Sequence, residues 1–225
     1  MDKDEKGLSR RQMLGMGVGL GGLVISGGVG LLFAQNAKHL TTPPVTKGPF
    51  YPTIKPLDQD ADLTILAGKK ERAEGKIVHL VGRVLNAKGE PVSGAKIELW
   101  QANTHGRYAH PRDRNTAPLD SNFQGFGIQT TDKEGRYRFK TIKPGAYPND
   151  PNWMRPPHLH FDISGKVDNL VTQMFFPGEP LNDKDYIYQD LGSGKDAVTA
   201  KVQPLTKEME ADSLLLLWDI VLTKG

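Results

Sequence analysis

Short β-rich runs separated by turn residues are the feature that most limits the folds open to this chain. Between residues 76 and 222 these runs are KIVHLVGRVL, AKIELW, GIQTTD, RYRFKTI, HLHFDIS, LVTQMFF and LLLLWDIVL. In AKIELW, strand alternation puts Ala95, Ile97 and Leu99 on one face and Glu98 and Trp100 on the other. Short strands with turn signals at this density predict an all-β fold, specifically an antiparallel β-sandwich.

Three local expectations accompany this fold. The runs GIQTTD and RYRFKTI, joined by the turn KEG, are expected to pair as a hairpin with Tyr137 in the core. Only 206–213 (TKEMEADS) is expected to be helical, and briefly so. The segments 101–126 and 143–157 are long and rich in prolines and aromatic residues, which favours ordered, functional loops over disordered ones.

The first 37 residues differ from the rest of the chain. Arg10 and Arg11 precede an apolar, glycine-rich run that ends near Ala34. This order is typical of a secretory signal, and the paired arginines resemble a twin-arginine export signal, which predicts a periplasmic or extracellular protein. An uncleaved, outward-facing membrane anchor is the alternative, since about 20 apolar residues span a bilayer. The chain is thus divided into 1–37 (signal), 38–75 (an extended, proline-rich arm) and 76–225 (the sandwich domain).

Cysteine usage and charge exclude several kinds of function. The chain has no cysteine, which rules out disulfides, thiolate metal sites and cysteine nucleophiles. Its net charge is +3, and the basic residues are scattered rather than gathered into a stripe. We therefore expect no nucleic-acid partner, and contact with a membrane only through an uncleaved N-terminal segment. Any metal must be held by His, Tyr, Asp or Glu.

The stretch NWMRPPHLHF carries the chemistry that stands out most. On a strand, His158, His160 and Asp162 share one face, and Cβ atoms about 6–7 Å apart let both imidazoles reach one ion. Taken alone, the motif is better explained by two solvated or hydrogen-bonded histidines than by a metal site. Each long loop, however, carries a tyrosine in a rigid setting, Tyr108 and Tyr147, and a highly charged ion can ionise a phenol. Two imidazoles with two phenolates suit ferric iron better than zinc or copper.

The chain closely resembles the intradiol ring-cleavage dioxygenases, especially the iron-bearing subunit of protocatechuate 3,4-dioxygenase. The likeness is carried by GRVLNAKGEPVSGAKIELWQANTHGRYAHP, KPGAYP, WMRPPHLHF, LVTQMFFPG and the arm motif TKGPFYP, and it covers residues 45 to 223. It implies one Fe(3+) per chain, with Tyr147 and His160 as axial ligands and 76–225 as a catalytic domain. The implied metal ligands are Tyr108, Tyr147, His158 and His160.

The same resemblance implies an activity. A non-haem Fe(III) enzyme would insert both atoms of O2 into a catechol-type diol, with a protocatechuate-like substrate favoured, and give a cis,cis-muconate-type diacid. Arg155 and Gln173 fall on the family's catalytic arginine and glutamine, and Tyr147 on the ligand that the substrate displaces. Arg155, a permanent cation, would stabilise negative charge on the substrate ring. The implied substrate-binding residues are Thr46, Gly48, Pro49, Tyr51 and Asn149.

Departures and alternatives accompany this interpretation. Asn149 stands where protocatechuate enzymes usually place a tryptophan, so the choice of catechol stays open. The alternative is a non-catalytic transthyretin (prealbumin)-like sandwich that acts as a binding or spacer module. Such modules share the pattern of glycines, prolines and strand residues found here at 82–97 and 131–139. A zinc hydrolase is a weaker rival, because no carboxylate or cysteine ligand is in position. The arm and ligand set share one chain, which favours a homo-oligomer. Four other histidines are expected at the surface: His39, His79, His105 and His110.

Overall fold

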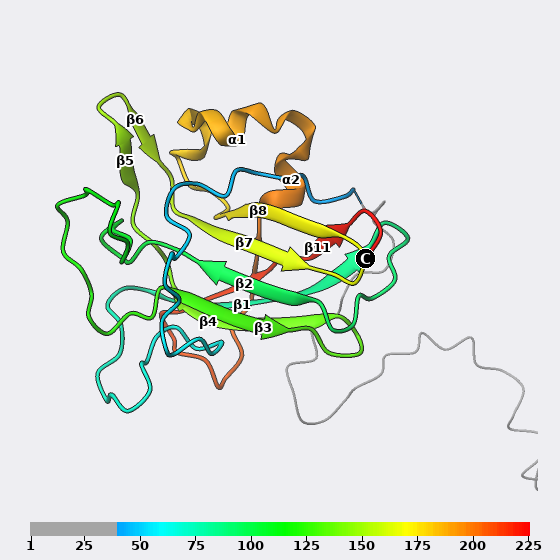
Figure 1. Ribbon diagram of the computed structural model, residues 1–225, viewed down its shortest axis with the longest axis horizontal. Helices are drawn as coiled ribbons and strands as arrows, with labels where there is room; N and C mark the ends of the chain where they lie inside the picture. The colour runs from blue at the N-terminus through cyan, green and yellow to red at the C-terminus, as the bar shows by residue number, and fades with distance from the viewer. Residues whose placement is uncertain (1–39) are drawn as a thin grey trace, which may run out of the picture. The chain divides into compact units, whose positions relative to one another are not determined.

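The computed structural model describes residues 40–225, which fall within one compact unit (Figure 1). The predicted export signal, its alternative as an anchor, and His39 lie outside these residues. Within residues 40–225, no helix is both long enough and apolar enough to cross a bilayer.

The described chain is mostly β-structure with a few short helical segments, as the pattern of short runs predicts. The strands are β1 (Ile77–Asn86), β2 (Lys96–Trp100), β3 (Phe126–Thr130), β4 (Arg136–Ile142), β5 (Tyr147–Asp150), β6 (Trp153–Arg155), β7 (His158–Ser164), β8 (Asn169–Phe175), β9 (Lys201–Gln203), β10 (Leu214–Leu217) and β11 (Ile220–Leu222). The helical segments are η1 (Asn182–Lys184), α1 (Tyr186–Asp190), η2 (Gly192–Gly194) and α2 (Lys195–Val198).

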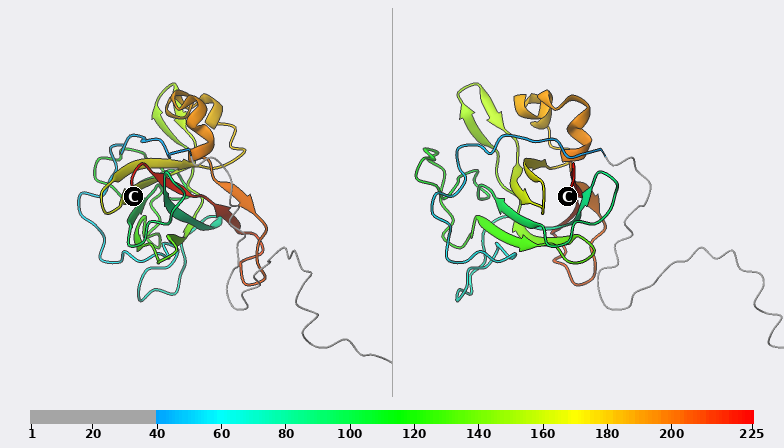
Figure 2. Two further views of the ribbon diagram at one scale, coloured as in Figure 1. Left: turned by 90° about the vertical axis from the view of Figure 1, so that its right-hand side faces the viewer. Right: turned by 45° about the vertical axis from the view of Figure 1, so that its right-hand side comes forward.

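Two sheets share one hydrophobic core. The first has the order β3-β2-β7-β8 and is antiparallel throughout. The second has the order β11-β1-β10-β9, with β4 also paired to β1. Side chains from both sheets meet in one buried cluster, among them Leu80 and Phe139 from the second sheet and Leu99 and Phe161 from the first. The two views in Figure 2 show the sheets as separate layers.

The second sheet corrects the expectation of a purely antiparallel sandwich. β1 runs parallel to both β10 and β11, which follow one another along it. Parallel pairing needs a long connection, and the chain from β2 to β9 lies between β1 and β10. Trp218 lies between β10 and β11 and passes close to β1 at Gly82. A Cβ at position 82 would lie 1.8 Å from the Trp218 carbonyl oxygen, so only a glycine there allows this close approach.

The expected hairpin of GIQTTD with RYRFKTI is also wrong. β3 pairs with β2 in the first sheet, whereas β4 pairs with β1 in the second, so the turn between them passes from one sheet to the other. The alternation within β4 is confirmed, because Tyr137 and Phe139 are buried between exposed Arg136 and Arg138. Alternation identifies the buried face of a strand, but it does not identify the neighbouring strand.

The predicted helix at 206–213 is replaced by turns, closed by hydrogen bonds such as Met209 N–H to Thr206 O. Glu210 in this segment binds His79 Nε2 at 2.7 Å and Lys140 Nζ at 2.8 Å. The expectation of a surface position is therefore wrong for buried His79, and it is also wrong for buried His110. His105 is exposed, as expected.

The arm lies against the edge and outer face of the first sheet, and its first residues also contact β11 of the second. Its Val45 N–H donates to Val171 O of β8, and Thr42 N–H donates to Val221 O of β11, each at 2.9 Å. In Figure 1 it crosses between β8 and the helices and then descends beside β7 and β2. Further along, Leu63 is fully buried in the core.

Candidate active site

Four predicted ligand side chains converge on one buried point. Tyr108 comes from the loop after β2, Tyr147 begins β5, and His158 and His160 lie on β7. His160 Nε2 is 3.1 Å from His158 Nε2 and 3.0 Å from Tyr108 Oη, and Tyr147 Oη is 3.5 Å from His158 Nε2. None of the four residues is more than 7% exposed.

Local sequence explains why the histidines face this point. Leu159, Phe161 and Ile163 of β7 are fully buried in the core between the sheets. Strand alternation therefore turns His158 and His160 to the opposite face, beneath the arm and the two long loops.

A glycine brings the two tyrosine loops together. Gly106 has φ +77°, and a Cβ there would lie 2.4 Å from Ala146 O, next to Tyr147. Gly145 N–H also donates to Asn103 O at 2.9 Å. Tyr108 is fixed in turn by its N–H, which donates to Asp113 Oδ2 at 2.7 Å. The loops that carry the phenols thus form one packed unit.

Burial sets the protonation of the four groups. It raises the pKa of Tyr108 and of Tyr147 despite the nearby charge of Arg155, so both phenols keep their protons when no metal ion is bound. Burial, helped by the charge of Arg155, lowers the pKa of His158 well below its usual value and that of His160 to about 3. Both imidazoles are therefore neutral and have a lone pair to offer.

The donor set fits a single metal ion. Neighbouring ligands about 2.1 Å from a shared ion lie about 3 Å apart, close to the distances found here. His158 Nδ1 is 2.7 Å from Pro156 O, which places its proton there and leaves Nε2 with a free lone pair. Residues 40–225 hold no cluster of three or more His, Cys, Asp or Glu side chains suited to a metal, so a metal here depends on the tyrosines.

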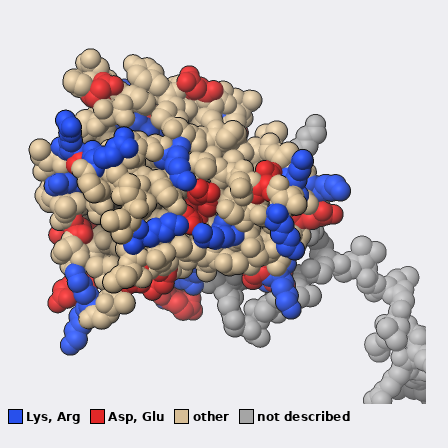
Figure 3. All heavy atoms as spheres, viewed as in Figure 1, with Lys and Arg blue, Asp and Glu red and all other residues tan. Residues whose placement is uncertain are grey.

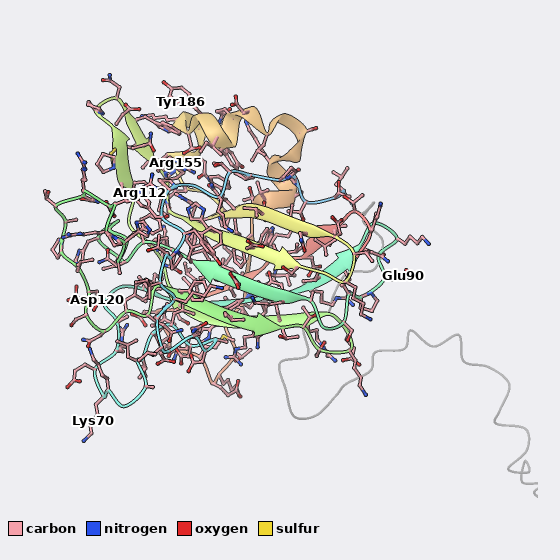
Figure 4. The ribbon with its side chains drawn as sticks, in the orientation of Figure 1. Lys70, Glu90, Arg112, Asp120, Arg155 and Tyr186 are labelled. Carbon is pink, nitrogen blue, oxygen red and sulfur yellow. The ribbon has the colours of Figure 1, made fainter. Side chains whose placement is uncertain are left out.

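Arg155, the predicted catalytic cation, is buried and held on two sides. Its Nε donates to Asp185 Oδ2 at 2.6 Å, and its Nη2 donates to Gln173 Oε1 at 2.7 Å. Gln173 Nε2 in turn donates a hydrogen bond to Thr46 O in the arm at 2.9 Å. Figure 4 shows Arg155 at the end of the molecule where β5 and β6 lie.

Asp185 and Trp100 are site residues that the sequence reasoning missed. Asp185 is fully buried, and its Oδ1 accepts the Tyr188 N–H at the start of α1. An Asp before a helix is a recognisable N-cap signal, but nothing in the sequence connects it to Arg155. Trp100, whose strand face the sequence predicts but whose neighbour it does not, stacks on His160 with ring centres 5.0 Å apart.

The predicted substrate-binding residues separate into two groups. Thr46 and Gly48 lie against Gln173 and His160, respectively. Tyr51 directs its hydroxyl to Glu98 at 2.6 Å, on the outer face of the sheet. Pro49 is exposed, and so is Asn149 on the β5–β6 hairpin.

A cavity of about 390 Å³ lies beside Tyr108, with Phe50, Leu57 and Phe126 among its lining residues. On the face shown in Figure 3, Lys and Arg side chains are interspersed with Asp and Glu.

Known proteins provide a comparison for this site. A family profile described as "Dioxygenase" matches residues 46–224. The chain is 47% identical over 174 residues to the protocatechuate 3,4-dioxygenase beta chain of Burkholderia cepacia, covering 75% of this chain and 73% of that one.

Two solved structures share the fold. The dioxygenase domain of a dioxygenase and carbohydrate-binding protein fusion from Streptomyces sp. SirexAA-E is 25% identical, with a TM-score of 0.62 and coverage of 82% of this chain and 99% of that one. Catechol 1,2-dioxygenase from Pseudomonas arvilla C-1 is 27% identical, with a TM-score of 0.64, and this chain covers 62% of its length. The chain therefore belongs to the dioxygenase family, as one of its intradiol ring-cleavage members.

Proposed function

We propose that this chain cleaves a catechol-type ring between its two hydroxyl-bearing carbons, using one ferric ion and O2, and that it releases a cis,cis-muconate-type diacid. The observation that carries the proposal is the convergence of two phenols and two neutral imidazoles, each with its donor atom within 3.5 Å of at least one other. A non-catalytic binding or spacer domain would not require this donor set or a buried arginine beside it.

Tyr108, Tyr147, His158 and His160 would hold the iron. Two phenols that lose their protons place two negative charges on a trivalent ion, which favours the ferric state over the ferrous one. Ferric iron bound there would supply the means of activating the catechol toward O2. The low pKa of His160, about 3, keeps its imidazole ready for the ion at any physiological pH.

Arg155 would act on the substrate rather than on the metal. Asp185 and Gln173 occupy its Nε and Nη2, while its Nη1 makes no hydrogen bond with the described residues. A guanidinium fixed in this way presents its free nitrogen in one orientation, which suits negative charge that builds up on a bound ring. Gln173 connects the same group to the arm through Thr46 O.

A protocatechuate-like substrate is the proposed preference, supported by the name of the Burkholderia relative. The test is to load the purified protein with ferric iron, record the visible tyrosinate-to-iron absorption, and assay a panel of catechols for ring-opened diacids. A band that shifts on adding a catechol, with turnover greatest for a carboxylated one, is expected. A colourless iron-loaded protein would refute the iron site, and turnover of other catechols alone would refute the preference.

Three further proposals concern the whole protein. The two-sheet core supports a transthyretin-like sandwich, and Arg10-Arg11 before an apolar run supports twin-arginine export. Replacing both arginines with lysine should then abolish export, and unchanged export would contradict this. A homo-oligomer is proposed because one chain carries both arm and ligand set. Light scattering of the purified protein measures its mass.

A further inference from the structure

The two candidate histidine ligands are held differently. His158 Nδ1 is hydrogen-bonded to Pro156 O, the usual way of fixing a metal-binding imidazole. His160 Nδ1 is buried, and no partner for it exists among the described residues. Since a buried imidazole without a second hydrogen bond can rotate about its Cβ–Cγ bond, something else must keep His160 Nε2 among the other donor atoms.

The contact that replaces the hydrogen bond is a ring stack. The Trp100 indole lies almost parallel to the His160 imidazole, with 5.0 Å between ring centres and 12° between planes. The two residues are cross-strand partners in the β2–β7 register, so the sheet itself brings the rings together. Trp100 Nε1 is also buried without a hydrogen bond in the described part of the chain. The stack therefore supports the imidazole where its Nδ1 makes no hydrogen bond, while Nε2 faces Tyr108 Oη and His158 Nε2.

The arm fixes the remaining sides of this pair. Gly48 approaches the His160 edge so closely that a Cβ there would lie 3.2 Å from Cε1. Tyr51 packs edge-on against the indole, 5.0 Å between centres, while its hydroxyl binds Glu98. Lys47 Nζ lies 3.8 Å from the centre of the Tyr51 ring. Trp100 is therefore itself immobilised, with 1% of its surface exposed.

We propose that Trp100 is a positioning residue that orients His160 for iron by stacking, in place of the hydrogen bond that orients His158. The inference rests on the proposed iron site and adds a residue to it. A stacked pair resists rotation of the imidazole, because turning the ring breaks the face contact and forces its edge into the indole. Loss of such support weakens metal retention by about 10- to 100-fold.

The test compares two replacements of similar volume at this position. Trp100→Phe keeps a flat ring, whereas Trp100→Met fills the space without one. Both proteins are loaded with ferric iron, and its release to an excess of a competing chelator is followed through the visible band. Iron release from Trp100→Met is expected to be about 10- to 100-fold faster than from wild type. Release from Trp100→Phe is expected to be much slower than from Trp100→Met, because the flat ring is kept. Equal release from the two variants, or wild-type release from Trp100→Met, overturns the proposal.

A second variant and a control separate positioning from general stability. Tyr51→Ala removes the ring that packs against the indole and leaves Trp100 in place, so iron release about fivefold faster than from wild type is expected. Release at the wild-type rate would contradict a supporting role for Tyr51. Trp218→Met makes the same change in the core, where Trp218 packs on Phe161, and should lower stability without changing release from folded protein. Failure of the wild type to bind iron would instead refute the proposed function.

Discussion

At the scale of single residues, the site depends on a buried ion pair. Arg155 and Asp185 are 4% and 0% exposed at their side chains, with 2.6 Å between Nε and Oδ2. Two charges placed so deep are stable only as a pair, because either alone would be desolvated without compensation. Asp185 therefore fixes Arg155 in place and also neutralises part of its charge next to the proposed iron site.

Asp185→Asn should lower the free energy of unfolding by about 3–5 kcal/mol, because it leaves the Arg155 charge buried and unpaired. Denaturant unfolding measures this. The matched control is Asp162→Asn, which breaks the half-exposed pair with Lys47 and should cost less than about 1 kcal/mol. Equal losses in the two variants would show that Asp185 does not hold a charge in the folded protein.

Ligand and substrate roles can be separated by iron content. Tyr108→Phe and His158→Ala should purify without iron, since each removes one of four donor atoms. Arg155→Ala should keep its iron and its visible band but lose turnover by about 100-fold or more, the usual effect of removing a group that stabilises developing charge. Loss of the iron from Arg155→Ala would contradict its assignment to the substrate.

At the scale of elements, the site is built where loops and arm close over the outer face of β2 and β7. The alternation in PHLHF predicts which side chains face outward, and the two tyrosines predict the donor set. The sequence could not show that β3 and β4 belong to different sheets, because a turn such as KEG serves a hairpin or a change of sheet. Nor could it reveal Asp185 or the Trp100 stack, which depend on strand register and helix placement.

The contact between the two tyrosine loops is testable at Gly106. Gly106→Ala combines a left-handed backbone, φ +77°, with a Cβ 2.4 Å from Ala146 O, so the loops must separate. Gly94→Ala has the same backbone strain, φ +78°, with nothing within 4 Å of the added Cβ. Both should lose about 1 kcal/mol of stability from strain, but only Gly106→Ala should lose iron. Full iron content in Gly106→Ala would mean that the loops are not coupled.

At the scale of the whole molecule, stability should depend on carboxylates held ionised in the folded state. Burial alone would raise the pKa of Glu98, but hydrogen bonds from Lys55, Lys96 and Tyr51 hold it at about 2. An unfolded glutamate has a pKa of about 4.3. Because the folded pKa is the lower one, Glu98 contributes its full stability above pH 4.3, and this is lost as the pH falls toward 2.

Glu98→Gln should therefore be less stable than wild type at pH 7 by about 1–3 kcal/mol, and the difference should shrink between pH 4.5 and 2. Unfolding in denaturant at a series of pH values measures it. Glu210, whose pKa is also lowered to about 2 by Lys140, is 42% exposed at its side chain, so Glu210→Gln should show a smaller change. A stability difference between wild type and Glu98→Gln that stays constant across this pH range would contradict a lowered pKa of Glu98 in the folded protein.

The parallel position of β11 beside β1 has a consequence for how the protein is made. The Arg83 N–H donates to Asp219 Oδ1, 136 residues further along. A ribosome adding about 5–20 residues per second needs about 7–27 seconds to cover that span. During this interval β1 has been synthesised, but its last partners have not, and an unpaired strand edge invites aggregation. The domain therefore completes its second sheet only after its C-terminal strand has emerged, and chaperones that cover β1 should matter most to newly made chains.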